Sequence, residues 1–202
     1  MKLYTARATP FGRAVEIVAH ELGIHGDIEI VATSVAPGKP NPEYQAVTAL
    51  KKIPALVTGD GMLIVDSAII TEYLAHRAGD RSLFATDSPD RFEVLSRYAL
   101  ARGIAECAVS ARYEMAARPE EKRWQGWVDD QLGRVTAALD HFERAPPEAG
   151  GPLTVADFAL GAALGYLDFR FADMGWREGR PQLAAFDATM AERPSFVATR
   201  PD

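Results

Sequence analysis

The first residues whose types could do chemistry are Thr9, Pro10 and Phe11, where a short apolar segment gives way to helical spacing. The first turn of a helix carries amide N–H groups without partners, and these favour an anion. The Thr9 hydroxyl can donate one further hydrogen bond there, so a bound thiol would shift towards its thiolate. The alternative is that Thr9 is an ordinary N-cap, whose oxygen accepts from the helix backbone.

A second group is the run Lys51-Lys52-Ile53-Pro54, directly before an expected strand. Proline removes a hydrogen-bond donor from a strand, and a cis bond before it would turn the Ile53 backbone outward. An extended peptide could then pair with that backbone. The alternative is a trans proline at the first residue of a strand, because only about 5–6% of such bonds are cis.

The third group is Asp66-Ser67, which follows an expected hairpin and begins an expected helix. Free N–H groups and the Ser67 hydroxyl suit a carboxylate, whereas the Asp66 side chain suits an ammonium group. Together they could hold the zwitterionic end of an amino acid. A plain N-cap pair is the alternative interpretation.

Motifs for metals and nucleotides are missing from the sequence. The four histidines have no ligand spacing, and there is no GxGxxG, GxxxxGK[ST] or GxSxG motif. We therefore expect no metal. Cys107 is the only cysteine, which excludes an intrachain disulfide and favours a reducing cytoplasm. Its neighbours Ile104 and Ala108 favour a small buried apolar residue over a reactive thiol.

The elements that must position these groups form a small α/β unit in the first 80 residues. Apolar residues at helical spacing between two short strands predict a βαβ unit with parallel strands. The Asp60-Gly61 step between two apolar runs predicts a hairpin, followed by a helix. The expected elements are strands at 2–5, 28–31, 55–58 and 62–65, helices at 10–23 and from 67, and a loop at 38–42.

After the polar stretch at 79–89 every long segment shows helical spacing, so we expect two domains, at residues 1–79 and 88–202. Thr154 and Asp157 predict a capping box, and the apolar helix behind it, with Gly161 and Gly165, is expected to be buried in close helix contacts. The expected helices are 89–117 with Ser88 as its cap, 119–142, one from 155, and one from 181 to before 194, with a turn at 146–152.

The composition favours a globular protein and argues against a nucleic-acid-binding or membrane-spanning one. The 202 residues carry 22 Lys and Arg against 28 Asp and Glu, a net charge of −6, which argues against nucleic-acid binding. With 48% apolar and 25% charged residues, the chain has the composition of a globular protein. The longest charge-free helical stretch, at 158–167, is about half of what a bilayer crossing needs, so we expect no membrane partner and a cytoplasmic location.

These features, in this order, resemble a cytosolic glutathione transferase, and the resemblance covers almost the whole chain. TPFGRAVEIVAHELGI is similar to the family's SPFxRKVRVxxxELGI opening, and KKIPALVTGDGMLIVDSAIITEYL to its KVPALxxxxGxxLxxSxxIxxYL core. LTVADFALG is similar to its helix 6 motif, and GYLDFRFADMGWREGRPQLAAF resembles a subgroup of bacterial transferase-like proteins. The resemblance implies an α/β thioredoxin-like domain followed by an all-α helical domain.

The resemblance also implies a role for each candidate residue. Thr9 matches the serine that donates to the glutathione sulfur, and Ile53 matches the residue whose backbone pairs with the cysteinyl unit, before a cis Pro54. Asp66 and Ser67 match the pair that receives the γ-glutamyl end. Lys39 and Lys51 are nearest to the positions that meet the glycyl carboxylate, and Asp157 matches a folding element. Apart from these matches, we expect Phe11 to contact glutathione and, with Tyr113 and Met115, to contribute to an apolar pocket for the electrophile.

The implied function is glutathione transferase activity in detoxification, with glutathione as co-substrate and a small hydrophobic electrophile, in a homodimer built on the helix at 89–117. Thr9 in place of serine adds a methyl group that restricts its rotamers, which predicts weak catalysis. Thr48-Ala-Leu-Lys-Lys52 replaces the family's NPLGK and loses a glycine at Lys51. The alternatives are a non-catalytic protein that binds glutathione or a partner, and a glutathione-dependent isomerase, dehalogenase or peroxidase.

Overall fold

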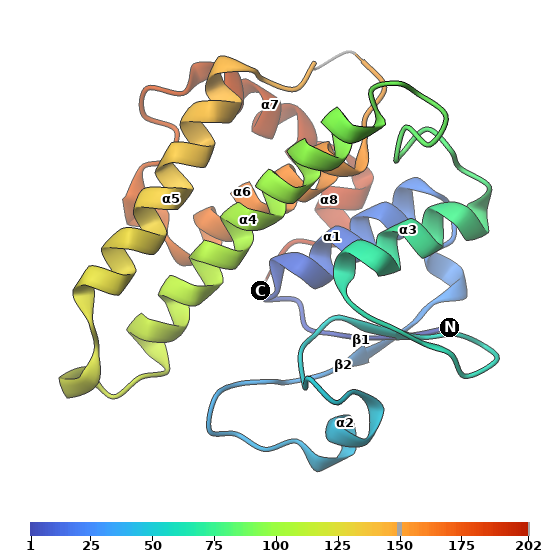
Figure 1. The fold of residues 1–202 in the computed structure, drawn as a ribbon, viewed down its shortest axis with the longest axis horizontal. Coiled ribbons are helices and arrows are strands. Elements are labelled where there is room, and N and C mark those ends of the chain that lie inside the picture. The colour runs from blue at the N-terminus through green and yellow to red at the C-terminus, as the bar shows by residue number, and fades with distance from the viewer. Residues whose placement is uncertain (149–150, 202) are drawn as a thin grey trace.

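The computed structural model describes residues 1–148 and 151–201, and it joins a mixed sheet to an all-helical part (Figure 1). The sheet has the order β2-β1-β3-β4, with β1 parallel to β2 and the other neighbours antiparallel. Its strands are β1 (Lys2–Thr5), β2 (Glu29–Ala32), β3 (Ala55–Val57) and β4 (Leu63–Ile64). The helices of this part are α1 (Pro10–Glu21), α2 (Pro42–Val47) and α3 (Ser67–Ala78), with a 3-10 turn η1 (His25–Asp27).

The second part is helical throughout its described residues. It contains α4 (Arg91–Ala116), η2 (Glu120–Lys122), α5 (Gln125–Arg144), α6 (Val155–Arg170), η3 (Ala172–Met174), α7 (Pro181–Ala191) and α8 (Pro194–Ala198). The predicted fold class, a thioredoxin-like βαβ-ββα domain followed by an all-α domain, is confirmed. No helix in the described part of the chain has the length and apolarity that crossing a membrane requires.

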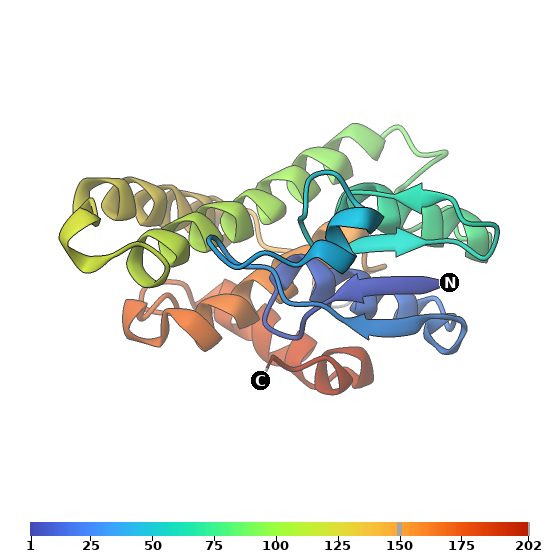
Figure 2. The same cartoon turned by 90° about the horizontal axis from the view of Figure 1, so that it is seen from below.

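Helices α1 and α3 cover one face of the sheet, and α2 lies beyond the other (Figures 1 and 2). Side chains alternate across a strand, so in β1 the buried Leu3 faces α1 and α3, whereas Tyr4 faces the opposite way. The Tyr4 ring packs against Tyr44 of α2, with ring centroids 5.6 Å apart. Strand β1 is therefore packed on both sides, whereas Ile30 of β2 and Leu63 of β4 stay exposed.

Helix α6 lies at the centre of the molecule, packed between α4 and α1. Thr154 and Asp157 form the predicted capping box at its start, where an Asp157 oxygen accepts from the Thr154 N–H at 2.7 Å. A side chain at Gly165 would collide with the Arg13 guanidinium of α1, and one at Gly161 with the Phe196 ring of α8. The close contacts expected of these two glycines are present, and one apolar core runs through both parts.

Two predicted helix starts are wrong. Helix α4 begins at Arg91 rather than Pro89, because the Ser88 hydroxyl accepts from the Asp90 N–H and holds residues 88–90 in a turn. Helix α5 begins at Gln125 rather than 119, because the buried Glu114 carboxylate accepts the Trp124 N–H at 2.8 Å. In both places the helix start is fixed by a polar side chain that does not belong to the pattern of apolar residues from which the helix was predicted.

Two short helices were not predicted. Helix α2 follows the expected loop at 38–42, and α8 lies beyond the last expected helix. Each begins with proline, Pro42 behind the N-cap Asn41 and Pro194 behind Arg193, which is the usual signal for a first helical position. The expected turn at 146–152 falls partly outside the described residues.

Candidate functional site

A cleft of about 1510 Å³ is lined by residues of both parts of the molecule. Its walls come from the start of α1, the loop before β3, the start of α3, and helices α4 and α6. Seven of the eight residues that the sequence singled out line it: Thr9, Phe11, Lys39, Ile53, Pro54, Asp66 and Ser67. The eighth, Lys51, lines a neighbouring pocket.

Thr9 is placed by a close approach of α1 to β1. A side chain at Gly12 would lie 1.8 Å from the Thr5 hydroxyl and 2.8 Å from the Thr9 methyl, so only glycine lets this turn pack so tightly. Thr9 is the N-cap by position, but its side chain makes no capping hydrogen bond. Among the described residues nothing accepts from the Phe11 N–H in the first turn. The anion-binding groups expected at this helix start are therefore free.

The Ile53–Pro54 peptide bond is cis, as is Val65–Asp66. The Ile53 backbone makes no hydrogen bond to any residue within the described ranges. The loop before it is held by Tyr44, whose hydroxyl donates to the Lys52 carbonyl at 2.6 Å. Burial raises the pKa of Tyr44 to about 12, so this phenol stays protonated and remains a donor.

Asp66 and Ser67 stand at the start of α3. One Asp66 oxygen accepts from the Ala68 N–H at 3.0 Å, and the other accepts from Arg102 of α4 at 2.6 Å. The Ser67 side chain is buried, and its hydroxyl has no hydrogen-bond partner among the described residues. Asp66 is thus both an N-cap and one half of an ion pair that joins the two walls of the cleft.

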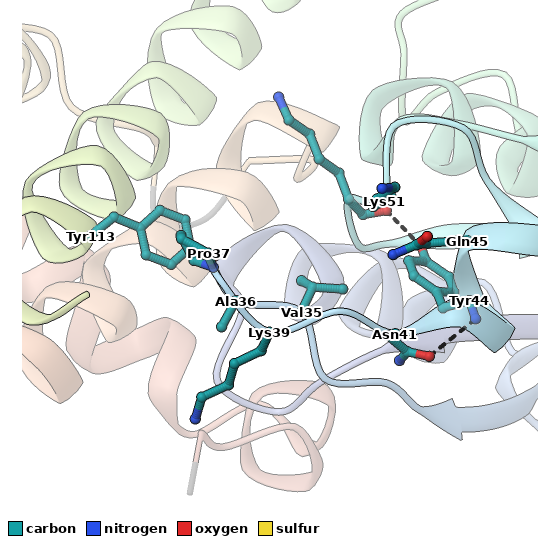
Figure 3. Close-up of a pocket in the computed structure, with 10 residues that line it drawn as sticks. Val35, Ala36, Pro37, Lys39, Asn41, Tyr44, Gln45, Lys51 and Tyr113 are labelled. Carbon is teal, nitrogen blue, oxygen red and sulfur yellow. Dashed lines mark hydrogen bonds between the residues drawn. The ribbon is translucent and has the colours of Figure 1, made fainter. Parts of the chain in front are cut away.

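The lysines lie around the loop between β2 and β3. A pocket of about 250 Å³ beside the cleft is lined by Lys39, Lys51 and Lys52, and Lys39 and Lys52 also line the cleft. Figure 3 shows this pocket, with Tyr113 of α4 and Pro37 among its walls. Lys51 has φ of 55°, the left-handed region that a glycine would adopt more easily. The turn therefore persists although the glycine is absent.

The helical wall differs from the expected apolar pocket. Phe11 and Tyr113 line the cleft, but Met115 does not. The sequence analysis missed Lys52 and the helical-domain residues Arg102, Arg112, Tyr166 and Arg170, which all line it. Helical spacing shows that residues 102, 106, 109 and 113 share one face of α4 and that residues 166 and 170 share one face of α6, but it does not show that these two faces meet in a cleft.

Cys107 is half-buried in α4 beside the apolar core. Burial raises the pKa of its thiol, which agrees with the apolar interpretation and not with a reactive thiolate. Within the ranges 1–148 and 151–201, no three His, Cys, Asp or Glu side chains gather as metal ligands do.

The chain has the architecture of a class of two-domain transferases: a thioredoxin-like domain, a helical domain and a cleft lined by both. Comparison with known proteins identifies the family within that class. Residues 3–82 match the family model "Glutathione S-transferase, N-terminal domain", and residues 125–186 match "Glutathione S-transferase, C-terminal domain". The chain belongs to the glutathione S-transferase family and is of the bacterial type.

Two relatives, one of them solved in two structures, show how far the likeness extends. The uncharacterized GST-like protein YibF of Escherichia coli K12 is 28% identical, over 100% of this chain and 98% of that protein. A glutathione transferase family member from Pseudomonas fluorescens Pf-5, solved with bound glutathione, is 36% identical with a TM-score of 0.96, over 100% of this chain and 98% of that one. Its structure with bound S-(propanoic acid)-glutathione gives 35% identity and a TM-score of 0.91, over 100% of both chains.

Proposed function

We propose that this protein is a glutathione transferase that binds glutathione in the cleft and promotes attack of its thiolate on a small hydrophobic electrophile. The observation that carries the proposal is the set of free polar groups on one cleft: the Thr9 hydroxyl, the Ile53 backbone and the Ser67 hydroxyl. A relative that is 36% identical over 98% of its chain was solved with glutathione bound.

In the proposed arrangement, each part of glutathione contacts a different group of the cleft. The cysteinyl backbone pairs with Ile53, which directs the sulfur towards Thr9 and the start of α1. The γ-glutamyl ammonium meets Asp66, and its carboxylate meets Ser67 and the first N–H groups of α3. A carboxylate can accept about four hydrogen bonds, so the existing bonds of Asp66 leave room for the ammonium. The glycyl carboxylate meets Lys39 and Lys52, with Lys51 nearby.

The proposed chemistry begins with ionisation of the thiol. Free N–H groups, the dipole of α1 and the Thr9 hydroxyl stabilise negative charge on sulfur and so lower the pKa of the thiol. The thiol proton passes to water in the open cleft, and the thiolate forms a bond from sulfur to the electrophilic carbon. On an aryl halide the halide departs with the electron pair of the broken bond, whereas the opened epoxide or the isothiocyanate stays attached and its oxygen or nitrogen takes a proton from water. A methyl group on Thr9 that packs against Gly12 restricts the hydroxyl and keeps the rate low.

Variants at Thr9 test this function. We expect Thr9→Ala to lower kcat/KM about tenfold to a hundredfold on aryl halides, epoxides or isothiocyanates, because a hydrogen bond to a charged group contributes about 1.5–3 kcal/mol. Thr9→Ser, which keeps the hydroxyl and removes the methyl, is the matched control and should retain or raise the rate. Glutathione binding without turnover on the whole panel would indicate the non-catalytic alternative instead.

We further propose a cytoplasmic homodimer with domains at residues 1–79 and 88–202. Exposed apolar side chains on neighbouring helices support the dimer, because Ile69 of α3 and Phe92 of α4 are 52% and 77% exposed. Helix α4 would supply much of the interface. Light scattering at micromolar concentration should give twice the mass of 22.0 kDa.

A further inference from the structure

The cleft carries a charge opposite to that of the whole chain. Six cationic side chains line it against two carboxylates, a net charge of +4, whereas the chain has a formal charge of −6. A cleft lined by one sign of charge concentrates ligands of the other sign. The six cationic residues are Arg7, Lys39, Lys52, Arg102, Arg112 and Arg170.

Two of these cations are not needed by glutathione. Both carboxylates of the cleft, Asp66 and Glu106, pair with Arg102, at 2.6 and 3.6 Å. The proposed function assigns one glutathione carboxylate to the lysines and the other to the start of α3. Arg112 and Arg170 make neither an ion pair nor a hydrogen bond with any residue that the structure describes. They are therefore available to a further anion.

Tyr166 adds a third donor beside these two guanidiniums. Its side chain lines the cleft, is only 6% exposed, and makes no hydrogen bond to a described residue. The Tyr166 oxygen is not among the buried side-chain atoms of the described residues that lack a partner, so it is open to the cleft and can donate to a ligand there. Burial raises the pKa of Tyr166, while the nearby charges of Arg170 and Arg112 act to lower it. The phenol therefore stays protonated at neutral pH and can donate.

The position of these donors connects them to the sulfur site. Gly165, the residue before Tyr166, packs against Arg13 of α1, and α1 begins directly after Thr9. Arg170 follows Tyr166 by one helical turn, and its guanidinium lies 3.8 Å from the centre of the Phe169 ring. Arg112 approaches from α4. Arg112, Tyr166 and Arg170 line the same cleft as Thr9, so an anion that they hold would lie on the helical wall of the cavity that contains the sulfur site.

We propose that Arg112, Arg170 and Tyr166 bind a carboxylate of the second substrate, so that the electrophile is a small apolar molecule that bears an acid group. This inference rests on the proposed function and names the substrate class of that site. Guanidinium groups bind carboxylates through charge-assisted, directional hydrogen bonds, which suits them to this role. The carboxylate takes no part in bond making; it positions the electrophilic carbon for the thiolate and leaves with the product.

Two matched glutathione conjugates test the proposal by calorimetry on the full chain. S-(carboxymethyl)glutathione and S-(carbamoylmethyl)glutathione have nearly the same size, and only the first carries the third carboxylate. We expect the acid to bind about tenfold more tightly than the amide. In Arg112→Gln and Arg170→Gln the ratio of the two Kd values should fall towards one, and in Tyr166→Phe it should fall severalfold. Arg77→Gln, at an exposed guanidinium outside the cleft, should retain the ratio.

The outcomes separate this inference from the proposed function. Equal affinity of the wild-type protein for the two conjugates, together with binding of glutathione, would overturn the carboxylate site and leave the transferase proposal intact. No binding of glutathione or of either conjugate would overturn both. A variant that fails to fold would bind neither conjugate, whereas a folded variant binds the amide and supplies the ratio. A preference for the acid that survives both arginine substitutions would contradict the assignment to these residues.

Discussion

At the scale of single residues, the backbone of Lys51 adopts a conformation that is unusual for a residue with a side chain. Its φ of 55° lies in the left-handed region, which costs a residue with a side chain about 1–2 kcal/mol. The family pattern has a glycine here, and the structure shows that replacing it did not remove the turn. The lysine accepts the conformation because the loop is fixed on both sides, by the Tyr44 hydroxyl and by the strand β3.

We expect Lys51→Gly to raise the free energy of unfolding by up to about 1 kcal/mol, because glycine adopts this φ without strain. Lys51→Ala is the control, since alanine keeps the strain and should change stability little. Chemical denaturation of the two variants measures the difference. If glycine proved no more stable than alanine at this position, the strain would not exist in solution.

Sequence reasoning found much of the site at this scale and missed the rest for a physical reason. Thr9, Ile53 and Ser67 could be found because each stands at the beginning of a helix or strand, where local chemistry marks it. Arg112 lies in the last turns of α4 and Arg170 ends α6, and a charged residue on a helix ordinarily indicates a solvated face. Only the packing of α4 and α6 decides that these residues face the cleft.

At the scale of elements, two glycines of α6 control how the helices pack. The position of an added side chain at Gly165 lies 2.1 Å from an Arg13 nitrogen, and at Gly161 it lies 2.6 Å from the Phe196 ring. Arg13 is buried, and one of its guanidinium nitrogens donates to the Phe196 carbonyl at 3.4 Å. Burial also lowers the pKa of Arg13, because its guanidinium is largely removed from solvent between α1 and α6.

We expect Gly165→Ala and Gly161→Ala each to lower the free energy of unfolding by about 1–3 kcal/mol, as overpacked cores do. Gly133→Ala in α5 is the matched control, because an added side chain there meets nothing within 4 Å. That variant should gain about 0.5–1 kcal/mol from better helix propensity. Thermal and denaturant unfolding measure all three, and a stabilised Gly165→Ala would contradict the packing described here.

A helix whose start and burial are marked by its own neighbouring residues could be predicted from the sequence. A helix start that depends on a contact with another helix could not. Helix α6 combines a capping box with an apolar sequence, so its start and its burial both follow from local residues. The start of α5 depends on Glu114, ten residues before Trp124 and in another helix. Helix α2 has six residues, too few to show a period, and α8 has five.

At the scale of the whole molecule, a polar cluster joins the first helix to the last. Glu21, at the end of α1, accepts hydrogen bonds from Arg193, the N-cap of α8, and from the Ser195 hydroxyl within α8. Partial burial acts to raise the pKa of Glu21, but these hydrogen bonds outweigh it, so the pKa is lowered from 4.5. A carboxyl with a lowered pKa in the folded state stabilises the fold above its unfolded pKa, and this stabilisation is lost as the pH falls.

We expect Glu21→Gln to lower the free energy of unfolding by about 1–3 kcal/mol at pH 7. The difference from wild type should shrink as the pH falls below about 4.5, because the wild-type carboxyl then takes up a proton. Denaturant unfolding between pH 3 and pH 7 measures it, with Glu29→Gln, an exposed carboxylate paired with Lys2, as control. A difference that stayed constant with pH would show that the charge of Glu21 contributes nothing.

We propose that this fold lowers the pKa of the glutathione thiol at the start of α1. The most direct test of this proposal is a pH titration of bound glutathione by ultraviolet difference spectroscopy, which detects the thiolate itself. An unperturbed cysteine thiol has a pKa of about 8.5, and we expect the bound thiol to show a thiolate fraction at neutral pH about tenfold larger than free glutathione. This excess should be reduced in Thr9→Ala. A bound thiol that titrates like the free one would contradict the account.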